Sequence, residues 1–172
     1  MVPVPQLISG EINLIMAELS FHRSSVVTAT AEEVLSSLTM KSVNAEMRPL
    51  ARMTVPTEWA DRPILEWPTG VPLFNSWILL LGILPVDRHS VCFRSITPGK
   101  GFAETSTSLL NSSWHHQRVI APCNSGCRIA DAVTFRCRLP LLGYLLRPLY
   151  TMVFRRRHQQ LRTRFAASID LQ

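Results

Sequence analysis

Polar and apolar residues alternate in the first segment of the chain that is predicted to form regular structure. Between residues 18 and 27, Leu19 and Phe21 fall on one side and Ser20 and His22 on the other. This period of two is typical of a strand with one buried face. We therefore predict a first strand here.

Two helices are predicted after this strand. Thr30 is followed three residues later by Glu33, the pattern of a capped helix start. Apolar residues at helical spacing predict a second helix over residues 42–53, which Pro49 should kink or shorten. Four prolines between residues 54 and 72 predict a rigid, irregular connection.

From residue 73 onward, runs typical of strands are separated by turn residues. This pattern predicts a meander of antiparallel strands. We expect five runs, at residues 73–81, 89–96, 101–110, 114–121 and 127–138.

The last predicted element is a long amphipathic helix over residues 145–166. Leu146, Leu149 and Val153 lie near one face, and arginines cover the rest. Pro148 is expected in its first turn, where no amide hydrogen bond is lost. A curved sheet with such a helix across its concave face would leave a cavity between the two.

Composition places these elements in one domain. The 172 residues are 47% apolar and 17% charged, which allows a core and excludes disorder as a global description. We expect a single domain over residues 18–172 after an N-terminal extension, residues 1–17. The extension lacks the pattern of a secretion signal, and the longest apolar stretch, residues 77–84, is far shorter than the roughly twenty residues of a membrane span. A cytoplasmic location is therefore predicted.

The positive charge is concentrated in the last helix. Residues 144–166 hold six arginines and no acid, which equals the net charge of +6. One hypothesis is that Arg155, Arg156 and Arg157 dock on an acidic membrane surface or an acidic protein partner, with strong salt dependence. Nucleic acid is not expected as a partner, because no exposed aromatic residues alternate with the arginines to stack on bases.

Two neighbouring predicted strands carry the residues best suited to chemistry. Trp114, His116 and Arg118 share one face of the first, and Asp131 interrupts an apolar row in the second. A hairpin through residues 124–126 would bring Arg118 opposite Asp131 within about one residue of register. These residues either form a cross-strand ion pair around a buried carboxylate or bind the head group of a ligand.

The chain resembles the SRPBCC superfamily of START-like, polyketide cyclase and lipid-transport proteins, and more closely its small bacterial ligand-binding members. The resemblance implies an α+β helix-grip fold, in which a curved antiparallel sheet of about six strands wraps around a long C-terminal helix, with two short helices after the first strand. The superfamily includes both carriers and enzymes, so its function does not follow from the fold. The similar stretches are SVNAEMRP at 42–49 with RMT at 52–54, SWILLLG at 76–82, WHHQR at 114–118, DAV at 131–133 and FRRRH at 154–158.

The predicted function is binding or transport of a hydrophobic or amphipathic small molecule, such as a lipid, in the cavity. His116, Arg118 and Asp131 would orient the ligand, and Arg48 or Arg52 at the cavity mouth would hold an anionic head group. The predicted apolar lining is Trp77, Leu79, Phe93, Trp114, Val133, Phe135, Leu149 and Val153.

A second hypothesis is an enzyme of the cyclase or hydratase type that uses His116 and Asp131 as acid and base. No established catalytic motif supports it, and the ligand-binding hypothesis is preferred. His115 and His116 are adjacent in a strand and point to opposite faces, so they do not both bind one metal ion. Cys123 and Cys127 lack the second ligand pair of a structural zinc site. Neither a metal nor another cofactor is expected.

Overall fold

Seven antiparallel strands form one sheet in the computed structural model, which describes residues 18–166. The predicted extension, residues 1–17, lies outside the described residues. The elements in chain order are β1 (Leu19–Val27), α1 (Ala31–Ser36), α2 (Met40–Met47), β2 (Ala51–Met53), α3 (Thr57–Ala60), the 3-10 helix η1 (Ile64–Glu66), β3 (Pro72–Leu80), β4 (Leu84–Thr97), β5 (Gly101–Ser108), β6 (Asn111–Cys123), β7 (Gly126–Cys137) and α4 (Pro140–Arg164).

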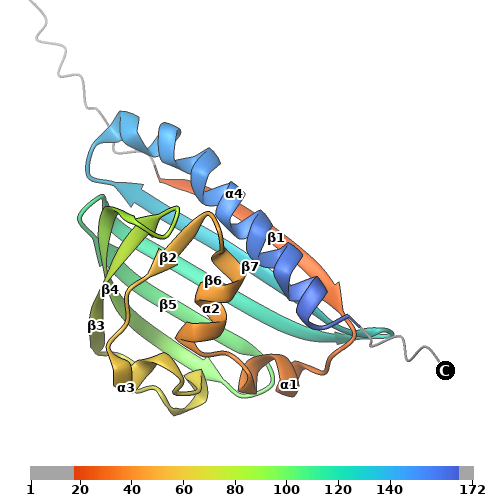
Figure 1. Cartoon of the computed structure of the whole chain (residues 1–172). Coiled ribbons are helices and arrows are strands. Elements are labelled where there is room, and N and C mark those ends of the chain that lie inside the picture. The colour runs from red at the N-terminus through yellow and green to blue at the C-terminus, as the bar shows by residue number, and fades with distance from the viewer. Residues whose placement is uncertain (1–17, 167–172) are drawn as a thin grey trace, which may run out of the picture.

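The sheet curls around the long last helix. Its strand order is β1-β7-β6-β5-β4-β3-β2, so the first two strands of the chain form the two edges. Helix α4 runs diagonally across β1 and β7, with α2 beside it, as Figure 1 shows. This arrangement confirms the predicted helix-grip fold. The short strand β2, which the sequence analysis did not predict, accounts for the additional strand.

Local sequence signals explain the short helices. The side chain of Thr30 accepts a hydrogen bond from the amide of Glu33, and the Glu33 carboxylate accepts one from the amide of Thr30, so the predicted capped start of α1 is confirmed. Thr39 and Ser42 form the same reciprocal arrangement at the start of α2. Both helices therefore begin where a side chain replaces a missing backbone partner.

The prediction of a helix over residues 42–53 is wrong in its second half. Helix α2 ends at Met47, ahead of Pro49, and the chain then enters β2. The side-chain amide of Asn44 donates to the carbonyl of Met53 at 2.9 Å and accepts from its amide at 2.7 Å. These two hydrogen bonds hold β2 against α2. They use the carbonyl and the amide of Met53 in the way that a paired strand would.

The placement of Pro148 in the first turn of the last helix is also wrong. Helix α4 begins at Pro140, and Pro148 lies inside it on the exposed side. The earlier proline supplies the helix start, because its fixed backbone angle suits the first helical position. The interior proline costs one backbone hydrogen bond, which the packing of α4 on the sheet outweighs.

The β6–β7 hairpin has the predicted register. Arg118 pairs with Asp131, and the apolar neighbours of Asp131 on the inner face of β7 divide into two groups. Cys127 and Ile129 belong to an apolar cluster with α1 and the middle of the sheet, whereas Val133 and Phe135 belong to a second cluster with Phe21 and Phe154. The aspartate therefore lies between two parts of the core.

Replacing Gly101 with alanine should lower the free energy of unfolding by at least about 2 kcal/mol. The backbone angle φ of Gly101 is +126°, which residues with a Cβ atom rarely adopt, and an added Cβ would collide with the carbonyl oxygen of Arg118 in the neighbouring strand. Gly82 is the matched control, because its φ is also positive, at +79°, but an added Cβ would meet open space.

We expect Gly82→Ala to cost about 1 kcal/mol, the backbone penalty alone. Urea unfolding of both variants measures the difference. Equal losses would contradict the close approach of β5 and β6 at Gly101.

Candidate functional site

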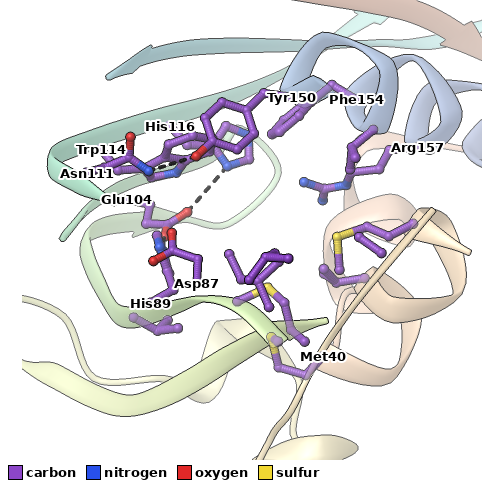
Figure 2. A pocket seen from close by; sticks show the side chains of 18 of the residues that line it. Met40, Asp87, His89, Glu104, Asn111, Trp114, His116, Tyr150, Phe154 and Arg157 are labelled. Atoms are coloured by element: carbon purple, nitrogen blue, oxygen red, sulfur yellow. Dashed lines mark hydrogen bonds and ion pairs between the residues drawn. The ribbon is translucent and has the colours of Figure 1, made fainter. Parts of the chain in front are cut away.

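A cavity of about 250 Å³ lies between the concave face of the sheet, α2 and α4. Figure 2 shows side chains from these elements surrounding an open centre. Polar groups reach the wall at only a few places: Thr39, Asp87, His89, Glu104, Asn111, His116, Tyr150 and Arg157. The apolar wall consists of Leu38, Met40, Val43, Met47, Ala51, Met53, Ile64, Trp67, Ile78, Leu80, Val86, Val91, Phe93, Phe102, Leu110, Trp114, Leu146, Leu149, Val153 and Phe154.

Regular spacing along each element creates this wall. Val91 and Phe93 of β4 are two residues apart and share the inner face of the sheet. The residues that α4 contributes recur three or four positions apart, the spacing of one helix face. They are Leu146, Leu149, Tyr150, Val153, Phe154 and Arg157.

Asp131 is the centre of a buried polar network behind the cavity. Its two carboxylate oxygens accept hydrogen bonds of 2.7 Å from Nε and Nη2 of Arg118. Nε2 of His116 lies 3.0 Å from one of these oxygens, and Nε2 of His158 lies 3.1 Å from the other. Nδ1 of His158 is 2.8 Å from the hydroxyl of Ser25. One carboxylate thus connects β7 with β6 and α4, and through His158 with β1.

A second carboxylate extends the network to the cavity wall. Oε1 of Glu104 lies 2.7 Å from Nε2 of His89 and accepts a 2.7 Å hydrogen bond from Ser106. Its Oε2 is 3.4 Å from Nδ1 of His116, the contact dashed in Figure 2. Both ring nitrogens of His116 therefore face carboxylates, and neither is left for a ligand.

A third carboxylate joins α2 to the same network. Oε2 of Glu46 lies 3.1 Å from Nε of Arg157 on α4 and 3.8 Å from Nη2 of Arg118. All three side chains are at least 94% buried. The two helices that form the cavity wall are thereby linked by an ion pair that water does not weaken.

The network keeps its charged groups ionised despite their burial. Burial alone would raise the pKa of the Asp131 carboxyl, but the charge and hydrogen bonds of Arg118, followed by those of His116, hold this pKa well below its usual value. Burial likewise opposes ionisation of Glu104, yet hydrogen bonds from His116 and His89 lower its pKa. Burial disfavours the Arg118 cation too, but Asp131 raises its pKa above the usual value.

A separate polar group lies at the side of the cavity where β4, β6 and α4 meet. Asp87 is 3% exposed, and its Oδ1 accepts hydrogen bonds from the amides of Arg88 and Leu110. The side-chain amide of Asn111 donates to the hydroxyl of Tyr150 at 2.9 Å. Figure 2 shows Arg157 across the cavity from this group.

The chemistry available at the site is limited by how its ionisable side chains are paired with one another. Asp131 does not line the cavity, and its oxygens are occupied by Arg118 and two histidines. His116 contributes to the wall, but its nitrogens are held by Asp131 and Glu104. The arrangement favours a rigid binding site over acid–base chemistry by this pair.

Comparison with protein-family models matches residues 25–165 to the family described as Domain of unknown function (DUF8410). The chain belongs to this family. A search of curated proteins finds no match to the DUF8410 chain.

Several solved structures have the same fold, and three of them are differently named proteins. A START superfamily protein from Mycobacterium smegmatis has 11% identity and a TM-score of 0.56, over 86% of this chain and 96% of that one. The di-domain ARO/CYC protein StfQ from the steffimycin biosynthetic pathway has 14% identity and a TM-score of 0.57, over 87% of this chain and 50% of that one. Ara h 8.0201 has 11% identity and a TM-score of 0.52, over 84% and 98%. At these identities the likeness establishes that the DUF8410 chain shares the helix-grip fold of these proteins, and not its function.

The structure places only some of the predicted ligand-binding residues in the cavity wall. Phe93, Trp114, His116, Leu149 and Val153 line the cavity. Their contacts with a ligand stay predictions.

Four further predicted residues are buried behind the wall. Arg118 and Asp131 form the cross-strand ion pair that was one of the two predicted alternatives. Val133 and Phe135 pack in the apolar cluster with Phe21 and Phe154 and do not line the cavity. These four residues support the wall from behind.

Trp77 and Leu79 are corrected from the cavity wall to the opposite face of β3. Ile78 and Leu80 line the cavity, so their neighbours in the strand point the other way. Trp77 is 43% exposed, and the guanidinium of Arg88 lies 6.0 Å from its ring centre. Both faces of this strand are apolar, so alternation alone does not identify the inner one.

The arginines predicted to contact a ligand or an acidic partner lie in different surroundings. Arg48 and Arg52 follow the end of α2 at Met47, and both are exposed and outside the cavity wall, so their role at the cavity mouth stays a prediction. Arg157 is 5% exposed and paired with Glu46, so it is not part of an outer basic surface with Arg155.

Cys123 and Cys127 lie at the two ends of the β6–β7 turn as free thiols. Within residues 18–166, no group of three or more His, Cys, Asp or Glu side chains is arranged to hold a metal ion. No helix in this part of the chain has the length and apolar character needed to cross a membrane.

The sequence analysis missed several polar residues of the site. Glu104 stands between Phe102 and Ser106 on the inner face of β5, so alternation could have identified it, as it identified Asp131. Asp87 falls between the predicted strand runs at 73–81 and 89–96, whereas β4 begins before it, at Leu84. The helical spacing of α4 could have predicted that Tyr150 lies on the same face as Leu146 and Val153.

Replacing Asp131 with asparagine should lower the free energy of unfolding by about 3–5 kcal/mol at pH 7, because the Arg118 cation would stay buried beside a neutral amide. Glu18→Gln is the matched control. Glu18 also faces an arginine, Arg136, at 3.4 Å, but the two side chains are 53% and 45% exposed. This control should cost less than about 1 kcal/mol.

Urea unfolding across a pH series adds a second readout. The folded-state pKa of Asp131 is lowered, so its ionised form contributes stability above the unfolded-state pKa of about 4. That contribution is lost as the pH falls through the lowered folded-state pKa, and the difference between wild type and Asp131→Asn should shrink there. Equal losses in Asp131→Asn and Glu18→Gln at pH 7 would contradict the role given to the network.

Proposed function

We propose that the protein binds one apolar or amphipathic small molecule, a lipid being one such class, in the cavity between the sheet and α4. The observation that carries the proposal is the cavity of about 250 Å³ with its almost entirely apolar wall. Ligand sites in proteins are typically mostly apolar, with a few polar groups that orient the ligand. The volume lies just below the usual range of about 300–1,000 Å³, which favours a small ligand.

The distribution of polar groups supports binding in this cavity. The ionic groups of Asp131, Arg118 and Glu46 are used to connect the sheet with α2 and α4. A rigid scaffold keeps the apolar wall open, because closing the cavity would require these buried ion pairs to move. The protein would therefore present a preformed site and lose little free energy in reorganising around a ligand.

Replacing Val153 with tryptophan should weaken binding of the neutral fluorescent probe N-phenylnaphthylamine at least about tenfold. Val153 lines the cavity from α4, and the larger indole would occupy part of the space. Met152→Trp is the matched control, because Met152 is the next residue of the same helix and is 44% exposed. Fluorescence titration measures both affinities, and thermal unfolding verifies that both variants fold.

We expect Met152→Trp to bind the probe as the wild type does. The same affinity in Val153→Trp and in wild type, with both proteins folded, would place the probe outside the cavity and contradict the proposal.

A further inference from the structure

Asp87 carries a buried carboxylate oxygen with no partner in the protein. Among residues 18–166, only Oε1 of Glu46 and Oδ2 of Asp87 are buried side-chain oxygen or nitrogen atoms without a hydrogen bond. Glu46 is still paired with Arg157 through its other oxygen. Asp87 forms no ion pair within the described residues, and it lines the cavity.

The backbone holds this carboxylate in one orientation. Oδ1 of Asp87 accepts a 2.8 Å hydrogen bond from the amide of Arg88 and a 3.1 Å hydrogen bond from the amide of Leu110. With one oxygen anchored in this way, the position of Oδ2 is fixed as well, and Asp87 belongs to the cavity wall, where Figure 2 labels its side chain. A buried charged oxygen is stable only when it finds a hydrogen-bond donor or a cation.

Tyr150 adds a donor to the same side of the cavity. Its hydroxyl accepts from the side-chain amide of Asn111, which leaves its own proton available. Burial first, and then the nearby charge of Asp87, raises the pKa of Tyr150, so the hydroxyl stays protonated at neutral pH. An unpaired acceptor and an available donor thus belong to one side of a cavity whose wall is mostly apolar.

We infer that Oδ2 of Asp87 accepts a hydrogen bond from the polar end of the ligand, and that this end is a hydroxyl or a protonated amine on an apolar body. The inference rests on the proposed function and names the ligand class. A carboxylate at the same place would meet the charge of Asp87 and is disfavoured. A hydroxyl can donate to Asp87 and accept from Tyr150 at once, whereas an ammonium group gains from the full negative charge.

Three probes with the same apolar chain test this inference: octanol, octylamine and octanoate. Isothermal titration at pH 7 should show octanol and octylamine binding to the wild type at least about tenfold more tightly than octanoate. Asp87→Asn keeps an oxygen for the amides of Arg88 and Leu110 but replaces Oδ2 with an amide group that donates hydrogen bonds. It should therefore lose at least about tenfold in octylamine affinity and gain affinity for octanoate.

Two variants complete the design. Asp61→Asn removes the same charge from an acid whose side chain is 74% exposed, and it should bind all three probes as the wild type does. Tyr150→Phe keeps the shape of the wall, and Asn111 retains Ser108 as a second acceptor. This variant should lower the affinity for octanol but not the affinity for octylamine. It tests the site independently if Asp87→Asn does not fold.

The outcomes separate the inference from the proposed function. Equal affinity of the three probes for the wild type, unchanged in Asp87→Asn, would overturn the inference while leaving apolar binding intact. Tighter binding of octanoate than of octanol would also overturn it. Failure of all three probes to bind would contradict the proposed function and, with it, the inference. A preference for octylamine over octanol, or the reverse, would assign the donor as charged or neutral.

Discussion

The carboxylate of Asp131 determines how the sheet and its long helix fit together. A buried charge is tolerated only when its partners are in place, and the partners of Asp131 come from different elements. Arg118 and His116 lie on β6, and His158 lies on α4, with Ser25 of β1 behind it. A shift of one residue in the β6–β7 register, or a rotation of α4, would leave the carboxylate unpaired. The ion pair thus specifies a single arrangement of the sheet and the helix.

The cavity is a consequence of this constraint. Arg118 continues the network to Glu46 on α2, and Glu46 to Arg157 on α4, so both helical walls are fixed relative to the sheet. With the ionic groups used in this way, the remaining inner surface is apolar and encloses space. Asp87 differs from the other buried carboxylates of the site because it forms no ion pair with a cation of the described residues. Its unpaired oxygen is the main support for the polar end inferred for the proposed ligand.

Features that depend on neighbouring residues were predictable from the sequence. Alternation and turn residues predicted six of the seven strands, and the position of Arg118 opposite Asp131 followed from the hairpin. Features that depend on how distant elements pack were not. No local pattern places Glu46 beside Arg157, and the apolar run around Trp77 gives no preference for either face of the sheet. Asp87 was missed because a proline and an aspartate together favour a turn, whereas pairing with β3 extends the strand through them.

The similar solved structures share the fold of this chain. The central claim to be tested is that the protein binds a small molecule in the cavity. Native mass spectrometry tests that claim most directly. The purified protein would be incubated with a total lipid extract, separated from unbound material and weighed intact, and any bound molecule would then be released with organic solvent. The account predicts one additional small mass per protein chain, which the solvent removes. A protein that keeps its bare mass after this exposure, while remaining folded, would contradict it.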